Sequence, residues 1–181
     1  MLFAAAVVVS CAVSGPAEPL PPPATREYHV RALDPRVREW IELGAANSRT
    51  LDGLLSRLAK SDVIVYVQVL DRIPGGAAGQ IFFVTSTETA RYLRIELDGR
   101  RSLVEILATL GHELEHAAEI AAAPHVRDSR AMAAMYLRPG DPSTWYDSAA
   151  ARLTGERVRD ELGRTYARTR DRTRAGTKSQ P

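Results

Sequence analysis

Two histidines, His112 and His116, stand four residues apart in the run His-Glu-Leu-Glu-His, and this spacing constrains the chain more than any other feature. In an α-helix, side chains four residues apart lie on one face, one turn above the other. Both imidazoles could then reach one metal ion, and Glu113 would lie where it can take a proton from a metal-bound water. In a chain of this length and composition, the pattern His-Glu-x-x-His arises by chance with a probability of roughly 0.6%.

The flanking residues predict the helix that this spacing requires. Ser102 and Glu105 form a capping box, in which both side chains bond to backbone N–H groups at a helix start. Apolar residues then recur at helical spacing, and Pro124 follows them, so we expect a helix from about 103 to 122. Its polar row consists of Glu105, Thr109, His112, His116 and Glu119. The simpler interpretation of this row is a surface helix with two exposed histidines.

A catalytic zinc site usually takes three protein ligands and leaves one position for water. We expect Asp147 to be the third ligand, because it begins the otherwise apolar face of a second predicted helix, where an unpaired acid is costly. That helix is expected to open with Asp141 as its N-cap and Pro142 as its first residue. The alternative role for Asp147 is a carboxylate that interacts with the helix dipole.

Two further carboxylates could complete the metal site. Glu119 shares the face of the histidine pair, where its position suits either ligation or a supporting hydrogen bond to His116. Asp128 lies in the loop after the predicted helix, where its position resembles that of the aspartate ligand of aspzincin-type metallopeptidases. His125 is a lone loop histidine and Glu156 lies on the solvent side of the second helix, so both rank lower.

Residues 112–116 resemble the H-E-x-x-H signature of zincin-type zinc metallopeptidases. The metzincin form has a glycine and a histidine where this chain has Glu119 and Ala122, so the chain is more similar to the gluzincin and aspzincin patterns. The resemblance implies an α+β fold, in which a small twisted β-sheet packs on a zinc-binding helix with flanking helices. It also implies a Zn²⁺-dependent hydrolase that cleaves a peptide or protein substrate, with Glu113 as the general base.

Hydrolysis would also require a second donor to the developing oxyanion, for which Tyr136 and Tyr146 are the nearest candidates in the sequence. Two other functions stay open. The chain could be a non-catalytic envelope protein that keeps the helix for structure or binding, or a metal-dependent hydrolase that acts on a bond other than a peptide.

Three apolar or alternating segments predict the strands of the sheet, at 61–70, 80–85 and 91–97. The resemblance implies that an edge strand, here the second or third of these, would pair with an extended substrate. Two helices are expected before the strands, from Asp34-Pro35 to about Gly44 and from Ser48 to Lys60.

Residues 1–24 have a different character from the remainder. An apolar run from Leu2 to Val13 and a proline-rich linker after it are typical of a signal or lipoprotein-type segment. Residues 8–11 are similar to a bacterial lipobox, with Cys11 as the lipidated residue. We therefore expect an exported protein, periplasmic or membrane-anchored through this segment or a lipid. An ordinary cleaved signal and a buried N-terminal helix are the alternatives.

The rest of the chain divides into a domain at 25–163 and a basic tail at 164–181, which we expect to be disordered. Cys11 is the only cysteine, so no disulfide can form within the chain. The net charge of +2 is close to balance and gives little support to nucleic-acid binding.

Overall fold

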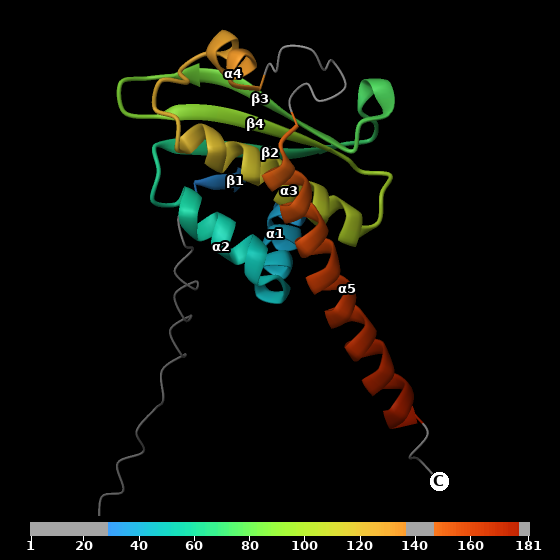
Figure 1. The fold of residues 1–181 in the computed structure, drawn as a ribbon. Helices are drawn as coiled ribbons and strands as arrows, with labels where there is room; N and C mark the ends of the chain where they lie inside the picture. Colours follow the sequence, from blue (N-terminus) through green and yellow to red (C-terminus); the bar gives the residue numbers. More distant parts are fainter. Residues whose placement is uncertain (1–28, 137–146, 178–181) are drawn as a thin grey trace, which may run out of the picture.

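Four strands form one mixed sheet in the computed structural model, which describes residues 29–136 and 147–177 (Figure 1). The strands are β1 (Val30–Ala32), β2 (Val63–Leu70), β3 (Gly79–Ser86) and β4 (Arg91–Asp98). Their order is β1-β2-β4-β3, with β1, β2 and β4 parallel and β3 antiparallel at the edge. The three predicted strands correspond to β2, β3 and β4, and the short β1 joins them. The coarse α+β class is confirmed.

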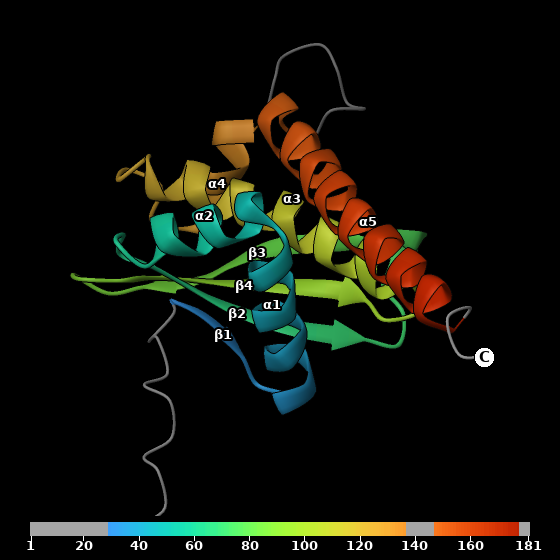
Figure 2. The same cartoon turned by 90° about the horizontal axis from the view of Figure 1, so that it is seen from below.

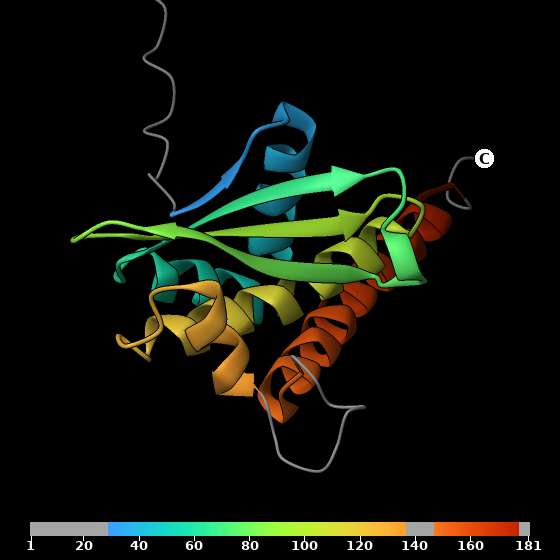
Figure 3. The same ribbon diagram turned by 90° about the horizontal axis from the view of Figure 1, so that it is seen from above.

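The helices and one short 3-10 turn complete the described part of the chain. They are α1 (Pro35–Asn47), α2 (Arg49–Leu58), η1 (Pro74–Gly76), α3 (Leu103–Ala121), α4 (Ser129–Tyr136) and α5 (Ala149–Thr177). Figures 1 and 2 show α1, α2, α3 and α5 on one side of the sheet, and Figure 3 shows the sheet from the opposite side, in front of them. The hydrophobic core lies between the sheet and these helices.

The burial pattern of β2 shows which face of the sheet packs against the helices. Val63, Val65 and Val67 are almost fully buried, whereas the alternating residues between them are only partly buried. Successive side chains of a strand point to opposite faces, so the three valines all face the helices. One face of β2 therefore packs on the helical layer, and its other face stays partly exposed.

Helix α3 agrees closely with its prediction and occupies the centre of the helical layer. The Ser102 hydroxyl accepts a hydrogen bond from the Glu105 N–H at 3.3 Å, as expected for the capping residue. Leu107, Leu110 and Leu114 are buried against the core. The helix therefore carries its apolar stripe inward and brings its histidine face toward α5 and the start of β3.

Two glycines allow α5 to approach α3 closely. A Cβ atom on Gly111 would lie 2.8 Å from Val158 Cγ2, and one on Gly155 would lie 3.2 Å from the Ala108 carbonyl oxygen and 3.3 Å from His112 Cβ. The glycine before the histidine pair costs about 1 kcal/mol within a helix relative to alanine, and here it lies at a close helix–helix contact that a Cβ atom would obstruct. This contact sets the distance between the histidine face and the residues at the start of α5.

The start of α5 differs from the expectation. Ser148 caps the helix, since its hydroxyl accepts from the Ala151 N–H at 3.0 Å, and Asp147 therefore precedes the helix instead of lying within it. The predicted cap at Asp141 and Pro142 lies outside the described residues. The inward face is otherwise as predicted, with Ala151, Val158 and Leu162 buried.

The far end of α5 also differs from the expectation. The helix continues from residue 164 to Thr177, where the sequence predicted a disordered tail, and in Figure 1 it projects away from the sheet. Alanine and arginine are strong helix formers, and no proline interrupts this stretch. The signal-like segment 1–24 lies outside the described residues. Within the described ranges no helix has the length and apolarity needed to cross a membrane.

Candidate metal centre

His112, His116 and Asp147 lie together between α3 and the start of α5. One potential ligand atom from each lies within 4.8 Å of the others. The two imidazole rings have centroids 5.0 Å apart, edge to face, and His112 Nε2 lies 3.4 Å from Asp147 Oδ1. Ligands about 2.0–2.1 Å from a tetrahedral zinc ion are themselves about 3.3–3.4 Å apart, so this last distance suits one ion between them.

Two atoms of this group are buried without a hydrogen-bond partner in the described part of the chain, namely His116 Nε2 and Asp147 Oδ1. An unpaired buried polar atom costs about 1–3 kcal/mol, so native proteins rarely leave two of them side by side. A divalent cation between the imidazoles and the carboxylate would satisfy both atoms. The residues present therefore fit a zinc ion by their donor types as well as by their placement.

The protonation of His112 favours the same role. Burial lowers the pKa of this imidazole, and the neighbouring His116 lowers it further, while Asp147 opposes them. A depressed pKa keeps the ring neutral near pH 7, and the neutral ring is the form that binds a metal ion.

Glu119 supports the centre from behind. Its Oε2 lies 2.9 Å from His116 Nδ1, and it accepts hydrogen bonds from the hydroxyls of Tyr136 at 2.9 Å and Ser148 at 2.5 Å. Burial raises the pKa of Glu119, but the bonds from His116, Ser148 and Tyr136 outweigh it and lower the pKa overall. The carboxylate therefore stays charged and holds the proton of His116 on Nδ1, which leaves Nε2 free for a metal.

Of the two roles considered for Glu119, these contacts favour the supporting hydrogen bond. We expect Glu119→Gln to weaken zinc binding by about 10–100-fold, the usual effect of losing a carboxylate behind a histidine ligand. Competition with a zinc chelator at pH 7.5 measures this. The matched control is Glu42→Gln on the exposed face of α1, which should leave zinc affinity unchanged. Equal affinity of native protein and Glu119→Gln would contradict the role.

Glu113 follows His112 on α3 and lines the same pocket as that histidine. Its side chain is 6% exposed, and a Cβ on Gly79 would lie 3.0 Å from Glu113 Oε1, so β3 begins against this carboxylate. Burial raises the pKa of Glu113 to about 7, with His116 opposing the shift and Asp147 adding to it. A carboxyl group with this pKa can accept and release a proton near neutral pH.

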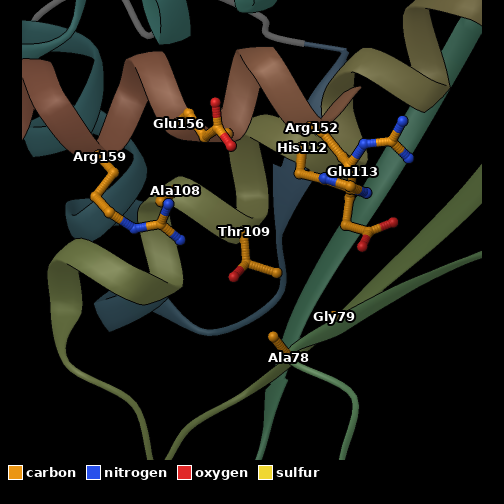
Figure 4. A pocket seen from close by; sticks show the side chains of 10 residues that line it. Ala78, Gly79, Ala108, Thr109, His112, Glu113, Arg152, Glu156 and Arg159 are labelled. Carbon is orange, nitrogen blue, oxygen red and sulfur yellow. The ribbon is translucent and has the colours of Figure 1, made fainter. Parts of the chain in front are cut away.

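The pocket extends from the candidate centre along α3 and α5 and has a volume of about 340 Å³. Residues from the start of β3, from α3 and from α5 line it (Figure 4). The side chains of His112, Glu113 and Arg152 cluster at one end of the pocket in that view, and Arg159 lies at the other. A substrate in this pocket would therefore contact Glu113 and the ligand His112 directly.

Several residues named from the sequence lie elsewhere or act differently. Asp128 is not part of the group, because its Oδ1 accepts from the Ala131 N–H at 2.7 Å and caps α4. His125 is exposed in the loop before α4. The Tyr136 hydroxyl is directed to Glu119, so this tyrosine is not placed to bind an oxyanion, and Tyr146 lies outside the described residues.

Two residues of the site were missed from the sequence. Ser148 could have been found as a preferred N-cap before three alanines. Arg152, which donates to Asp147 Oδ2 at 2.8 Å, has no local signal, since five residues separate the two along the chain.

Comparison of the chain with protein-family models, with curated proteins and with solved structures finds no match. The function must therefore be argued from the site.

Proposed function

We propose that the protein is a zinc-dependent hydrolase, most simply a metallopeptidase of the zincin type. One observation carries this proposal: His112, His116 and Asp147 offer ligand atoms within 4.8 Å of one another, and two buried atoms of this group, His116 Nε2 and Asp147 Oδ1, form no hydrogen bond within the described residues. The adjoining pocket presents a buried carboxyl group, Glu113, whose raised pKa suits a general base. A structural zinc site would use four protein ligands, whereas three ligands leave a position for water or substrate.

The chemistry follows from the placement of these groups. A bound zinc ion supplies Lewis acidity, which acidifies water and polarises a carbonyl group. Glu113 would accept a proton from the attacking water as its oxygen bonds to the carbonyl carbon. The same carboxyl group would then give this proton to the amide nitrogen as the C–N bond breaks. One water and one peptide bond thus yield a carboxylic acid and an amine, which exchange a proton to become a carboxylate and an ammonium group.

Strand β3 is the feature that favours an extended peptide as the substrate. Of the two strands expected to bind substrate, β4 lies inside the sheet between β2 and β3, while β3 lies at the edge. Gly79, the first residue of β3, lies against Glu113 and lines the pocket. An extended chain that pairs with this edge would therefore pass the proposed base.

Export and membrane attachment are proposed on sequence grounds only. The apolar segment and Cys11 lie outside the described residues, so the proposal of a periplasmic or membrane-anchored protein, a lipoprotein at Cys11 included, rests on their resemblance to a lipoprotein signal. Metabolic labelling with a palmitate analogue, in native protein and in Cys11→Ser, tests it.

Metal content tests the proposed centre. We expect about one zinc per chain after purification and dialysis, and a loss of more than 90% of it in His116→Ala, because the remaining two ligands cannot hold the ion. His125→Ala removes an exposed loop histidine and serves as the matched control, with zinc content unchanged. Less than a tenth of a zinc per native chain would contradict the proposal.

Hydrolysis is then measured with a library of fluorogenic peptides. We expect cleavage by the zinc-loaded protein, loss of cleavage with a chelator, and recovery when zinc is restored. Zinc at one equivalent with no cleavage of any peptide would instead favour the non-catalytic protein or a hydrolase of another bond.

A further inference from the structure

Arg152 lies at the metal end of the pocket, in the first turn of α5. Its Nη1 donates to Asp147 Oδ2 at 2.8 Å, and its side chain is 50% exposed. It lines the same pocket as His112 and Glu113, and the three side chains lie together in Figure 4. A guanidinium group at this position is a feature that the histidine motif does not contain.

The two oxygens of Asp147 have different surroundings. Oδ1 is the buried, unpaired atom that lies 3.4 Å from His112 Nε2, whereas Oδ2 accepts from Arg152. The guanidinium is therefore separated from the candidate ligand atoms by a single carboxylate group. Because Asp147 holds one nitrogen of Arg152, the group stays beside the centre although half of it is in solvent.

Most donors of this guanidinium remain available. An arginine side chain has five N–H donors, and within the described residues only one of its hydrogen bonds, to Asp147, is formed. Arg159, the other cation of the pocket, is committed to both oxygens of Glu105 at 2.9 and 3.1 Å. Arg152 is thus the cation of the pocket with free donors near His112 and Glu113.

The reaction proposed above requires a donor of this kind. When water adds to a carbonyl carbon, the carbonyl oxygen becomes an oxyanion, and a donor that is already in place stabilises it. Tyr136, the donor expected from the sequence, is bonded to Glu119. A guanidinium beside the ligands offers both positive charge and two or more N–H groups for this oxygen.

We propose that Arg152 is a catalytic residue that donates hydrogen bonds to the oxyanion formed from the scissile carbonyl group. The assignment rests on the proposed hydrolase function. Asp147 then has two tasks, since Oδ1 faces the metal position and Oδ2 anchors the guanidinium. A mere ion pair on the surface is a weak alternative, because an exposed pair of this kind contributes little to stability.

The test compares Arg152→Gln and Arg152→Lys with native protein, all saturated with zinc. Arg157→Ala is the matched control, an exposed arginine of the same helix that does not line the pocket. For a fluorogenic peptide chosen with native protein, we expect Arg152→Gln to lower kcat by about 10²–10³-fold with KM within about threefold. Arg152→Lys should recover part of kcat, and Arg157→Ala should match native protein.

A binding measurement gives a second readout that needs no turnover. A peptide phosphonamidate imitates the tetrahedral oxyanion, and its Kd, measured by calorimetry, should rise in Arg152→Gln by about the factor by which kcat falls. The absorption spectrum of the cobalt-substituted protein should be the same in native protein and variant, which shows that the ligand set is intact.

The outcomes separate the two proposals. Native protein that takes up no zinc removes the hydrolase proposal and the role of Arg152 with it. If native protein takes up zinc and Arg152→Gln keeps both kcat and phosphonamidate affinity within about threefold, only the Arg152 assignment is overturned. A rise in KM at unchanged kcat, limited to acidic peptides, also overturns it, because the arginine then binds a substrate carboxylate.

Discussion

Replacement of Arg91 by alanine is expected to lower the free energy of unfolding by about 3–5 kcal/mol, the largest stability effect that we predict for a single residue. Arg91 is 1% exposed and begins β4. It forms two hydrogen bonds with Asp62, at 2.6 and 2.8 Å, and donates to the Ile120 carbonyl at 2.6 Å and the Ala123 carbonyl at 2.9 Å. It thus adds a charged donor to carbonyl groups at the end of α3, although Ile120 and Ala123 each also accept a backbone N–H at 3.0 Å.

The charge of Arg91 adds to this effect. The C-terminal end of a helix carries partial negative charge, so a buried cation there is favourable. Alanine would remove both hydrogen bonds to Asp62 and the added donor to the Ile120 and Ala123 carbonyls, and it would leave a cavity where the guanidinium lay. Since His116 and Glu119 lie in the last two turns of α3, loosening of this end would also disturb the candidate centre.

Urea denaturation at pH 7 measures the change. Arg94→Ala is the matched control, because Arg94 lies on the same strand, is 45% exposed and pairs with Glu96 at 3.1 Å. Glu96 is only 11% exposed and the Arg94 guanidinium also lies 5.0 Å from the Phe82 ring centroid, but Arg94 itself is half in solvent. We therefore expect Arg94→Ala to cost on the order of 1 kcal/mol, well below the cost of Arg91→Ala. If Arg91→Ala and Arg94→Ala lowered the free energy of unfolding equally, the buried contacts of Arg91 would not stabilise the fold more than those of Arg94.

The pH dependence gives an independent check on the same contact. The hydrogen bond from Arg91 lowers the pKa of Asp62, although partial burial opposes this. A carboxylate with a depressed pKa in the folded state stabilises the fold fully above its ordinary pKa of about 3.9, and this contribution is lost as the pH falls through the folded value. The difference in Tm between native protein and Arg91→Ala should therefore narrow between pH 5 and pH 2.

The sequence could predict the helices and strands whose apolar residues repeat at a regular spacing along the chain. The apolar spacing around His112 and His116 predicts α3, and β-branched runs predict β2 and β3. Asp147 was expected beside the histidine pair because an acid on an apolar face needs a partner, and it does lie there, although it precedes α5 by two positions. The coarse α+β class follows from these elements.

The features that the sequence could not predict depend on contacts between distant residues. Arg91 reaches the end of α3 about 30 residues later, and nothing local marks it as a helix cap. Asp128 shows the reverse problem, because an aspartate in a loop suits both a metal ligand and a helix N-cap, and only the fold decides. Strand β1 has three residues, too few to show a period of two.

Glu113→Gln is expected to lower kcat by about 10³-fold while zinc stays bound at one equivalent, the largest effect on activity among our predictions. The amide keeps the shape of the side chain but cannot accept a proton at neutral pH, so the substitution removes the base and leaves His112 and His116 in place. Zinc content and peptide hydrolysis are measured on the same sample. Glu115→Gln is the matched control, because Glu115 lies on the same helix but pairs with Arg57 at 2.8 Å.

The same variant should be more stable than native protein when both are free of metal. Burial raises the pKa of Glu113 from 4.5 to about 7, so the folded state holds a proton that the unfolded state releases above pH 4.5. This group therefore lowers stability progressively between about pH 4.5 and 7, and the full penalty remains above pH 7. Glutamine has no charge to desolvate, so we expect a gain on the order of 1–3 kcal/mol at pH 8 that disappears near pH 4.

These two measurements on one variant distinguish a base from a merely buried acid. A residue that is buried without a catalytic role would show the pH-dependent gain in stability with hydrolysis unchanged, which would contradict the role assigned to Glu113. If Glu113 is the base, Glu113→Gln should show both the gain in stability and the loss of kcat. The desolvation of Glu113 that destabilises the folded protein is also what brings its pKa close to neutral pH. The cost in stability at Glu113 would then be a direct consequence of its function.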